Sequence, residues 1–380
     1  MAVAPAFAAP PVDEIARYAE DVDREARFPS EAIAALERGG LLGLGVPERF
    51  GGPGGDAVDV VDVVEAIAGA CASTAMVYLM HVAATHTLVA GTAEDDDGPM
   101  TDTLRAIAAG RHVTTLAYSE RGSRGHFWAQ TSRARRDGNA VVIDAEKTFA
   151  TAAGHVSSYV VATGAPEGSA PTDTELYLVD AGSAGIEIPR RFDGLGLRGN
   201  ASAPLRLTGV RVTEDRRLGD PLSGFGLMLS ATLPWFVLGS AACSAGIAGA
   251  ALRSAIAHAG AARLEHIGAS LAELPAVRER LARAQTRLAE TRAYVREVAR
   301  LVATGDEAAQ LGVLAVKAAA ADMAAEVTEL CLRVGGGAAY AKHGPIERHF
   351  RDARAAAVMA PTTDVLHDFV GKAITGQELF

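Results

Sequence analysis

The sequence predicts an α+β protein with an N-terminal helical domain, a central β-barrel or β-sandwich domain and a C-terminal four-helix bundle. Short β-branched runs are confined to the middle of the chain, at residues 113–115, 141–143, 159–161, 176–179 and 205–208. Turn residues separate these runs, and Asp137-Gly138 is a strong hairpin signal. The residues on either side have the patterns of helices. We therefore expect domains at residues 1–112, 113–220 and 221–380.

Composition limits the classes of function. The chain has 380 residues, 49% of them apolar, which is enough for a large core in two or three domains. A net charge of −10 without a long basic run argues against a nucleic-acid partner. Cys71, Cys243 and Cys331 have neither metal-ligand nor disulfide spacing, which suits a reducing cytoplasm. No apolar run predicts a membrane span, and the first residues predict a tail, since they lack the regions of a signal peptide.

The N-terminal region predicts a series of helices. Ser30 is placed to cap a helix over residues 31–38, and Gly39-Gly40 would end that helix. The Gly-rich stretch 41–55 has neither the Lys-Ser/Thr of a P-loop nor the βαβ context of a Rossmann fingerprint. Residues 58–70 and 73–89 predict two further helices. The second carries His81 and His86, which lie on different helix faces because they are five residues apart.

Two lines of the central region carry chemically informative side chains. One is Leu116-Ala-Tyr118-Ser119-Glu120, and the other is Lys147-Thr-Phe149-Ala-Thr151. Alternation along a strand would place Phe149 and Thr151 on one face of the sheet. Taken alone, a Phe and a Thr at this spacing are most often core and ladder residues.

The C-terminal region is expected to form the helical bundle. Pro275 suits the first turn of a helix. The apolar positions that follow fall near helical spacing: Val277, Leu281, Ala284, Leu288, Val295, Val298 and Leu301. Long helices of this kind bury their apolar faces in a bundle, and any remaining apolar surface would pair subunits.

Several stretches together resemble the acyl-CoA dehydrogenase superfamily of flavoproteins, over nearly the whole chain. Beyond the two central lines, they are Gly335-Gly-Gly-Ala-Ala-Tyr340 and Glu347-Arg…Arg351-Asp352. The resemblance implies an acyl-CoA dehydrogenase-like fold and a cytoplasmic homotetramer or homodimer. It also implies FAD as the cofactor, clamped between subunits. FMN, or a reduced flavin delivered by a reductase, stays open as an alternative.

The resemblance also assigns contacts to the flavin. Phe149 would pack on the isoalloxazine, Thr151 would bond near its N5 atom, and Ser119 would serve the pyrimidine side. Arg263 would meet the diphosphate of a neighbouring chain's FAD. The cofactor-binding residues implied in this way are Tyr118, Ser119, Phe149, Thr151, Arg263, Arg333, Gly336, Gly337 and Thr362, and no metal site is expected.

The glutamate that serves the family as catalytic base is missing. Counting from Arg351, its place is taken by Ala360, and alanine cannot act as a base. Some members carry the glutamate on the helix that opens the last domain. The matching stretch here, Leu233-Pro-Trp-Phe-Val-Leu238, has no carboxylate. The side chains that remain as candidates for a catalytic role are His81, His126 and Asp364.

Three functions stay open at this point. The first is α,β-dehydrogenation of an acyl thioester, on CoA or a carrier protein, with a non-standard base. The second is a monooxygenase on the same fold, which would use oxygen and reduced flavin from a separate reductase. The third is a flavin-poor subunit whose partner chain supplies the base. The expected substrate is an acyl thioester or another small molecule. The class stays this broad because a fold alone does not determine the reaction.

Overall fold

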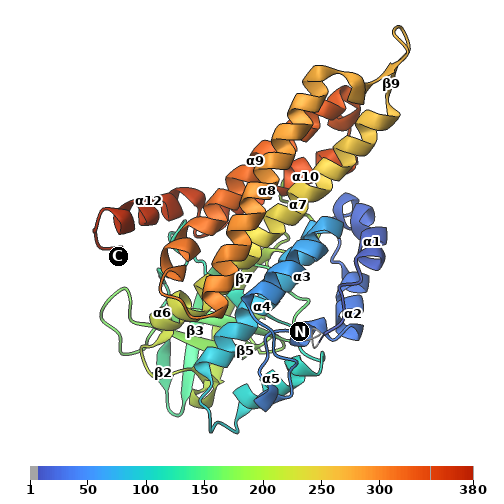
Figure 1. Ribbon diagram of the computed structural model, residues 1–380. Helices are drawn as coiled ribbons and strands as arrows, with labels where there is room; N and C mark the ends of the chain where they lie inside the picture. The colour runs from blue at the N-terminus through green and yellow to red at the C-terminus, as the bar shows by residue number, and fades with distance from the viewer. Residues whose placement is uncertain (1–6, 343, 380) are drawn as a thin grey trace.

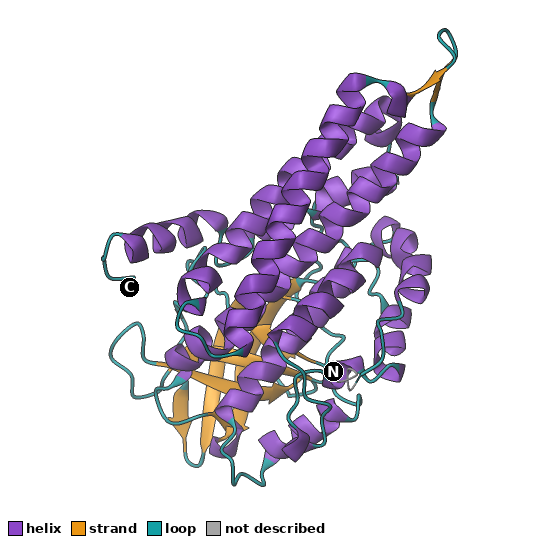
Figure 2. Cartoon of the chain, in the orientation of Figure 1, coloured by secondary structure: helices purple, strands orange, loops and turns teal. Residues whose placement is uncertain are grey.

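The computed structural model describes residues 7–342 and 344–379, and it has the three parts that the sequence predicts (Figures 1 and 2). Most of the expected N-terminal tail lies outside the described residues. The first part contains α1 (Val12–Arg24), α2 (Ser30–Arg38), η1 (Leu41–Gly43), η2 (Glu48–Phe50), α3 (Ala57–Ala70), α4 (Ala72–Gly91) and α5 (Pro99–Ala108).

A side-chain cap explains the start of α3, and glycines follow the end of α2. Asp56 caps the start of α3, because its side chain accepts from the backbone N–H groups of Val58 and Asp59. The side chain of Asp59 accepts in turn from the backbone N–H of Asp56. The prediction that Ser30 caps α2 is wrong: Ser30 is the first residue of α2 and makes no capping bond. Gly40, with a φ of 70°, follows the end of the same helix as predicted.

The central part consists of two packed four-stranded sheets. Their strands are β1 (Thr114–Ala117), β2 (Arg135–Asp137), β3 (Ala140–Ala150), β4 (Ser158–Gly164), β5 (Thr174–Asp180), β6 (Ile186–Glu187), β7 (Ala203–Thr213) and β8 (Arg217–Leu218), with η3 (Glu214–Arg216) before the last strand. One sheet has the order β1-β4-β5-β8 and the other β2-β3-β7-β6. The predicted hairpin joins β2 to β3 through Gly138, whose φ is 62°. The pair β1–β4 is parallel, and the remaining neighbours are antiparallel.

The two faces of β4 and β5 belong to different cores. Tyr159, Val161 and Tyr177 pack against the other sheet. Val160 and Leu178, on the opposite face, join the large core formed with the helices. Because both faces are covered, β4 is buried along its whole length. The first sheet is therefore the layer through which the β domain contacts the helices.

The C-terminal part is a long bundle. It contains α6 (Gly224–Leu227), the π-helix η4 (Met228–Thr232), α7 (Leu233–Ala261), β9 (Arg263–Leu264), β10 (Ala269–Ser270), η5 (Leu271–Glu273), α8 (Pro275–Ala303), α9 (Ala309–Tyr340), α10 (Pro345–Asp352), α11 (Ala355–Val358) and α12 (Thr363–Ile374). As predicted, Pro275 is the first residue of α8. The helices α7, α8 and α9 pack side by side, and α3 and α12 lie against α7 and α9 respectively.

The bundle extends away from the β domain, and the β9–β10 hairpin lies at its far tip (Figure 1). One helical stretch, Gly224–Ala261, is long and apolar enough to cross a membrane by length and composition. Its most apolar window is 94% buried inside the protein, so it is the core helix of the bundle.

Candidate active site

Three helical segments, two strand ends and two loops surround a small cavity of about 60 Å³ at the junction of the three parts. Its wall is mainly apolar, and the polar side chains in it are hydroxyls. The lining residues are Met80 of α4, Leu116 of β1 with Tyr118 and Ser119 just after it, Phe127, Phe149 of β3, Thr232 of η4, Leu233 and Phe236 of α7, and Ala360.

The two stretches that the family resemblance assigns to a catalytic base both border this cavity. Ala360 borders it from the loop between α11 and α12, and Leu233 and Phe236 border it from the first turns of α7. Among the described residues that line it, none has a carboxylate, an imidazole or an amine. The departure noted in the sequence is therefore concentrated at one point of the structure.

A buried lysine holds the segment that carries Ala360. The ammonium group of Lys317 donates to three backbone carbonyl oxygens, those of Ala356 at 2.7 Å, Met359 at 3.0 Å and Pro361 at 2.8 Å. Burial lowers the pKa of Lys317 to about 7, but these acceptors match the three donors of its charged form. The carbonyls on either side of Ala360 are thus fixed from the α9 side.

Three hydroxyls form a chain at the cavity wall. Tyr118 Oη lies 3.2 Å from Thr232 Oγ1, which lies 2.7 Å from Thr87 Oγ1. Thr87 in turn donates to the carbonyl of Ala83 at 2.8 Å. Burial raises the pKa of Tyr118, so its phenol stays protonated.

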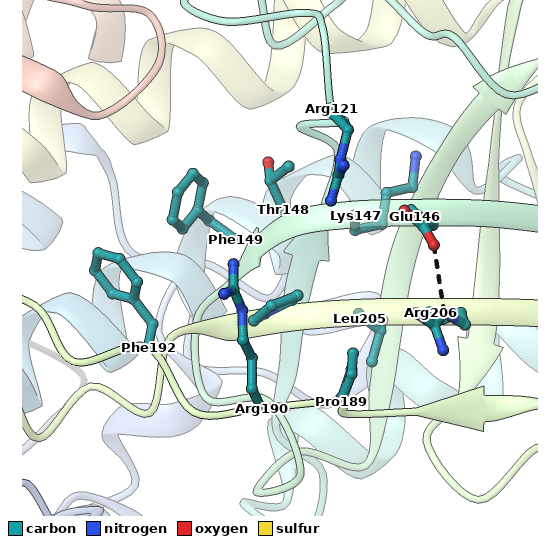
Figure 3. Close-up of a pocket in the computed structure, with 11 residues that line it drawn as sticks. Arg121, Glu146, Lys147, Thr148, Phe149, Pro189, Arg190, Phe192, Leu205 and Arg206 are labelled. Atoms are coloured by element: carbon teal, nitrogen blue, oxygen red, sulfur yellow. Dashed lines mark ion pairs between the residues drawn. The ribbon is translucent and has the colours of Figure 1, made fainter.

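Phe149 connects the cavity to a larger groove of about 360 Å³ on the outer side of the second sheet. Its side chain is 54% exposed and meets the edge of Phe192 at 5.3 Å between ring centroids. Figure 3 shows Arg121 and Arg190 on either side of this groove, with the Glu146–Arg206 ion pair at one end. The groove therefore combines an exposed aromatic surface with positive charge.

A β-bulge separates the environments of Phe149 and Thr151. The register of β3 on β7 shifts between Lys147 and Ala150, so regular alternation is broken there. Phe149 is exposed, while Thr151 lies beyond the strand end and is buried. The structure thus gives the two side chains different environments, contrary to the expectation that alternation continues through Thr151.

The structure gives His81 a role inside the fold. One ring nitrogen lies 2.8 Å from the carbonyl oxygen of Leu42, and the other accepts from the N–H of Thr114 at 3.1 Å. Burial lowers the pKa of His81, so the ring is neutral. Both nitrogens are occupied by backbone groups and His81 does not line the cavity, so this geometry does not support the predicted catalytic role.

His126 and Asp364 lie close together, but outside the cavity. Both are exposed and line a separate groove of about 470 Å³ beside α12. Thr362 caps α12 by accepting from the N–H of Val365 at 3.5 Å. A Cβ atom at Gly125 would lie 3.2 Å from the Thr362 hydroxyl, so the loop before His126 packs tightly on this cap. None of the three predicted catalytic residues therefore reaches the cavity.

The residues expected at the flavin diphosphate lie far from Phe149. Arg263 is in the hairpin at the tip of the bundle (Figure 1). Arg333, Gly336 and Gly337 are exposed near the end of α9, where Gly336 leaves helical geometry with a φ of 56°. Only Tyr118, Ser119 and Phe149 of the predicted cofactor set come together at the cavity.

Sequence reasoning missed several wall residues, notably Met80, Phe127 and Thr232. They lie on separate elements and carry no motif. Lys317 had a readable signal, because it is a single lysine within the apolar stretch 313–321 of a helix. Such a lysine is either exposed or, as here, bound to specific acceptors.

Comparisons with known proteins extend over the whole fold. The family models described as the N-terminal, middle and C-terminal domains of acyl-CoA dehydrogenase match residues 6–97, 115–210 and 223–375. The probable acyl-CoA dehydrogenase FadE25 of Mycobacterium tuberculosis is 28% identical over 361 residues, 95% of this chain and 91% of that protein. The short-chain specific mitochondrial acyl-CoA dehydrogenase of Bos taurus is 28% identical over 359 residues, which cover 93% of this chain and 84% of that protein. Butyryl-CoA dehydrogenase from Megasphaera elsdenii has a TM-score of 0.89 at 22% identity, with 95% and 94% coverage.

The fold and these matches define a FAD-dependent oxidoreductase. The chain belongs to the acyl-CoA dehydrogenase superfamily, whose members bind FAD.

The residues present fit this cofactor. Phe149 leaves half of an aromatic ring exposed next to the cavity, and a flat ring system would cover it. Arg121 and Arg190 supply positive charge in the adjoining groove. When bound, FAD would supply the hydride-accepting chemistry, while the protein supplies binding and orientation.

Replacing Phe149 by alanine should weaken FAD binding about tenfold, because stacking contributes roughly 0.5–1.5 kcal/mol beyond burial of area. Fluorescence titration of the apoprotein with FAD measures the dissociation constant. Tyr294→Ala is the matched control, since it removes a partly exposed aromatic ring of α8 that lines neither the groove nor the cavity. An unchanged dissociation constant for Phe149→Ala would remove this residue from the cofactor site.

Proposed function

We propose that this protein is a FAD-dependent dehydrogenase of short acyl thioesters that works without a carboxylate base. The observation that carries the proposal is the cavity itself. Ala360 and the start of α7 border it together with Ser119 and Phe149, which supports an acyl site whose described lining residues include no carboxylate. A volume of about 60 Å³ leaves room for only a few carbon atoms of the acyl chain.

The wall residues suggest a division of work. Met80, Leu116 and Phe236 would exclude water and enclose the acyl chain. Ser119 and Phe149 would hold the flavin, on the assignments that the family resemblance implies. The α carbon of the thioester would then lie beside Ala360, whose position Lys317 fixes.

The α proton needs an acceptor that this wall does not contain. Tyr118 is the only ionisable side chain among the lining residues, and burial raises its pKa. Its hydroxyl chain ends on the Ala83 carbonyl, which cannot take up a proton. We therefore propose that a basic group on the substrate, or a water molecule, receives the α proton.

An oxygen-dependent monooxygenase is the second candidate. The lack of a carboxylate in the cavity favours it, because that chemistry does not need a base to remove an α proton. The histidine that this candidate would use is not among the lining residues, which is why we place it second.

Two further proposals concern assembly and compartment. Phe149 borders the cavity at the junction of the three parts, whereas Arg263 lies in the β9–β10 hairpin at the far tip of the bundle (Figure 1). If both of them contact FAD, the contacts must come from two chains, which supports a homodimer or homotetramer. A cytoplasmic location, and a flavin reductase or partner subunit as helper, remain parts of the proposal.

Anaerobic titration of the FAD-loaded protein tests the reaction. Pantetheine and CoA thioesters of two to eight acyl carbons are added while the flavin absorbance is followed. We expect bleaching that is strongest for the short chains. Absence of bleaching with every thioester, with FAD demonstrably bound, would overturn the dehydrogenase. Product formation from reduced flavin and oxygen would then support the monooxygenase, and activity only with a co-expressed partner would support a subunit role.

A further inference from the structure

The hydroxyl chain of Tyr118, Thr232 and Thr87 ends on a backbone carbonyl, and this end determines which hydroxyl donates each proton. Thr87 donates its single hydroxyl proton to the carbonyl of Ala83 at 2.8 Å. Thr87 Oγ1 can therefore only accept from Thr232, at 2.7 Å. Thr232 has then used its own proton, so it accepts the phenol proton of Tyr118 at 3.2 Å. Every proton of the chain points away from the cavity and toward α4.

At Tyr118 and Thr232 the wall consequently offers acceptors and no donors, and Ser119 is the remaining hydroxyl among the lining residues. Tyr118 and Thr232 both line it and their hydroxyl oxygens lie 3.2 Å apart, and on this ground we place the phenol oxygen at the wall. A phenol oxygen has two lone pairs, and with these proton positions neither of them accepts from Thr232 or Thr87, the two threonine hydroxyls near it. The surrounding wall is apolar, with Leu116, Phe127 and Phe236 beside these hydroxyls. A polar atom of the ligand that reached this point would be deprived of water and would need its partner here.

We propose that the acyl group of the substrate carries a hydrogen-bond donor, a hydroxyl or an amine N–H, that binds to the Tyr118 oxygen. This inference rests on the proposed function, because it takes the cavity to be the acyl site. An acyl chain with a hydroxyl or amine would place its donor against the phenol oxygen. A chain with a carbonyl at the same place would set one acceptor against another and bind poorly.

Binding of matched ligands tests the inference without any turnover. The probes are pantetheine thioesters of pentanoate, 3- and 4-hydroxypentanoate and 4-oxopentanoate, which share the part common to CoA and carrier proteins. Their dissociation constants are measured anaerobically by calorimetry on the protein with its FAD already reduced, because reduced flavin cannot accept a hydride and no probe is turned over. We expect one hydroxy ligand to bind about tenfold more tightly than pentanoyl, and the oxo ligand to bind no more tightly than pentanoyl.

Two variants test the direction in which the hydroxyls of Tyr118, Thr232 and Thr87 donate their protons. Tyr118→Phe should bring the ratio of the hydroxypentanoyl and pentanoyl dissociation constants to about one. Thr87→Val keeps the shape of the threonine but frees the proton of Thr232, so the oxo ligand should bind more tightly than to the wild type. FAD content and circular dichroism confirm that both variants are folded.

The outcomes separate this inference from the proposed function. Equal binding of all the probes to the wild type, or a hydroxyl preference that survives Tyr118→Phe, would overturn the inference. Flavin bleaching without such a preference would support the dehydrogenase and reject the donor site at Tyr118. A preference without bleaching would keep the donor site and reject the dehydrogenase.

Discussion

Replacing Ala360 by glutamate should raise the rate at which short acyl thioesters reduce the bound flavin by about 10²–10⁴-fold, the usual contribution of a placed general base. Ala360 borders the cavity beside Phe149, and Lys317 fixes the carbonyls on both sides of it. A carboxylate at this point would meet the α carbon that the proposed function places there. Rapid-mixing absorbance at the flavin band, without oxygen, measures the rate.

The pH dependence of this variant is a second readout. The wall around residue 360 is apolar, so desolvation should raise the pKa of the new carboxyl above its ordinary value. Only the ionised form is a base, so the rate should rise with pH and level off above that pKa. Ala360→Gln is the control of matched shape, and it should give no gain. Equal rates for the glutamate and glutamine variants would mean that the α carbon does not lie beside residue 360.

Replacing Lys147 by methionine should lower the free energy of unfolding by about 3–5 kcal/mol, as expected when one partner of a buried ion pair is removed. Lys147 and Glu120 are both buried, and the Lys147 ammonium donates to Glu120 Oε1 at 2.6 Å. The remaining carboxylate oxygen accepts from the N–H groups of Thr131 at 2.6 Å and Ser132 at 2.7 Å. The pair joins β3 to the segment after β1, next in sequence to Ser119.

The pH dependence of stability should distinguish the loss of the Lys147–Glu120 ion pair from a simple loss of packing. Burial alone would raise the pKa of Glu120, but the Lys147 charge and the hydroxyl donors lower it to about 2. A carboxyl with a lowered pKa stabilises the fold above its ordinary pKa, and this stability is lost as the pH falls toward 2. Without Lys147 the pKa of Glu120 should rise, so the variant loses less on acidification. The stability gap between wild type and variant should therefore shrink below about pH 4.5.

Urea unfolding followed by circular dichroism measures the gap at each pH. Arg211→Met is the control, because Arg211 and Asp137 form an exposed pair on the same sheet. Such a pair contributes only about 0–1 kcal/mol. If Lys147→Met were no more destabilising than this control, the buried pair would have no special role in the β domain.

Much of the architecture was readable from local patterns. The β-branched runs became the strands of the two sheets, Gly138 became the hairpin turn between β2 and β3, and Pro275 became the first residue of α8. Each of these features depends on residues that are close in sequence, so periodicity and turn chemistry suffice. The prediction that Ser30 caps α2 was wrong because sequence patterns locate the start of a helix only to within one or two residues.

The candidate site was only partly readable. The family resemblance implied the missing base at Ala360 and the flavin contacts of Phe149 and Ser119, and the structure brings these three residues to one cavity. The histidines show where this reasoning stops. The sequence of the helix is the same whether His81 faces a substrate or two backbone groups, and only its neighbours Leu42 and Thr114 decide.

The sequence by itself determined the order of helical and β segments, the family resemblance and the absence of both usual glutamates. Tertiary structure alone decided that Ala360 and the start of α7 share one cavity, and that Thr87, Thr232 and Tyr118 form one hydroxyl chain. The physical reason is separation along the chain. A local pattern reports the face on which a side chain lies, whereas Thr87 and Thr232 are 145 residues apart and meet only when α4 packs against η4.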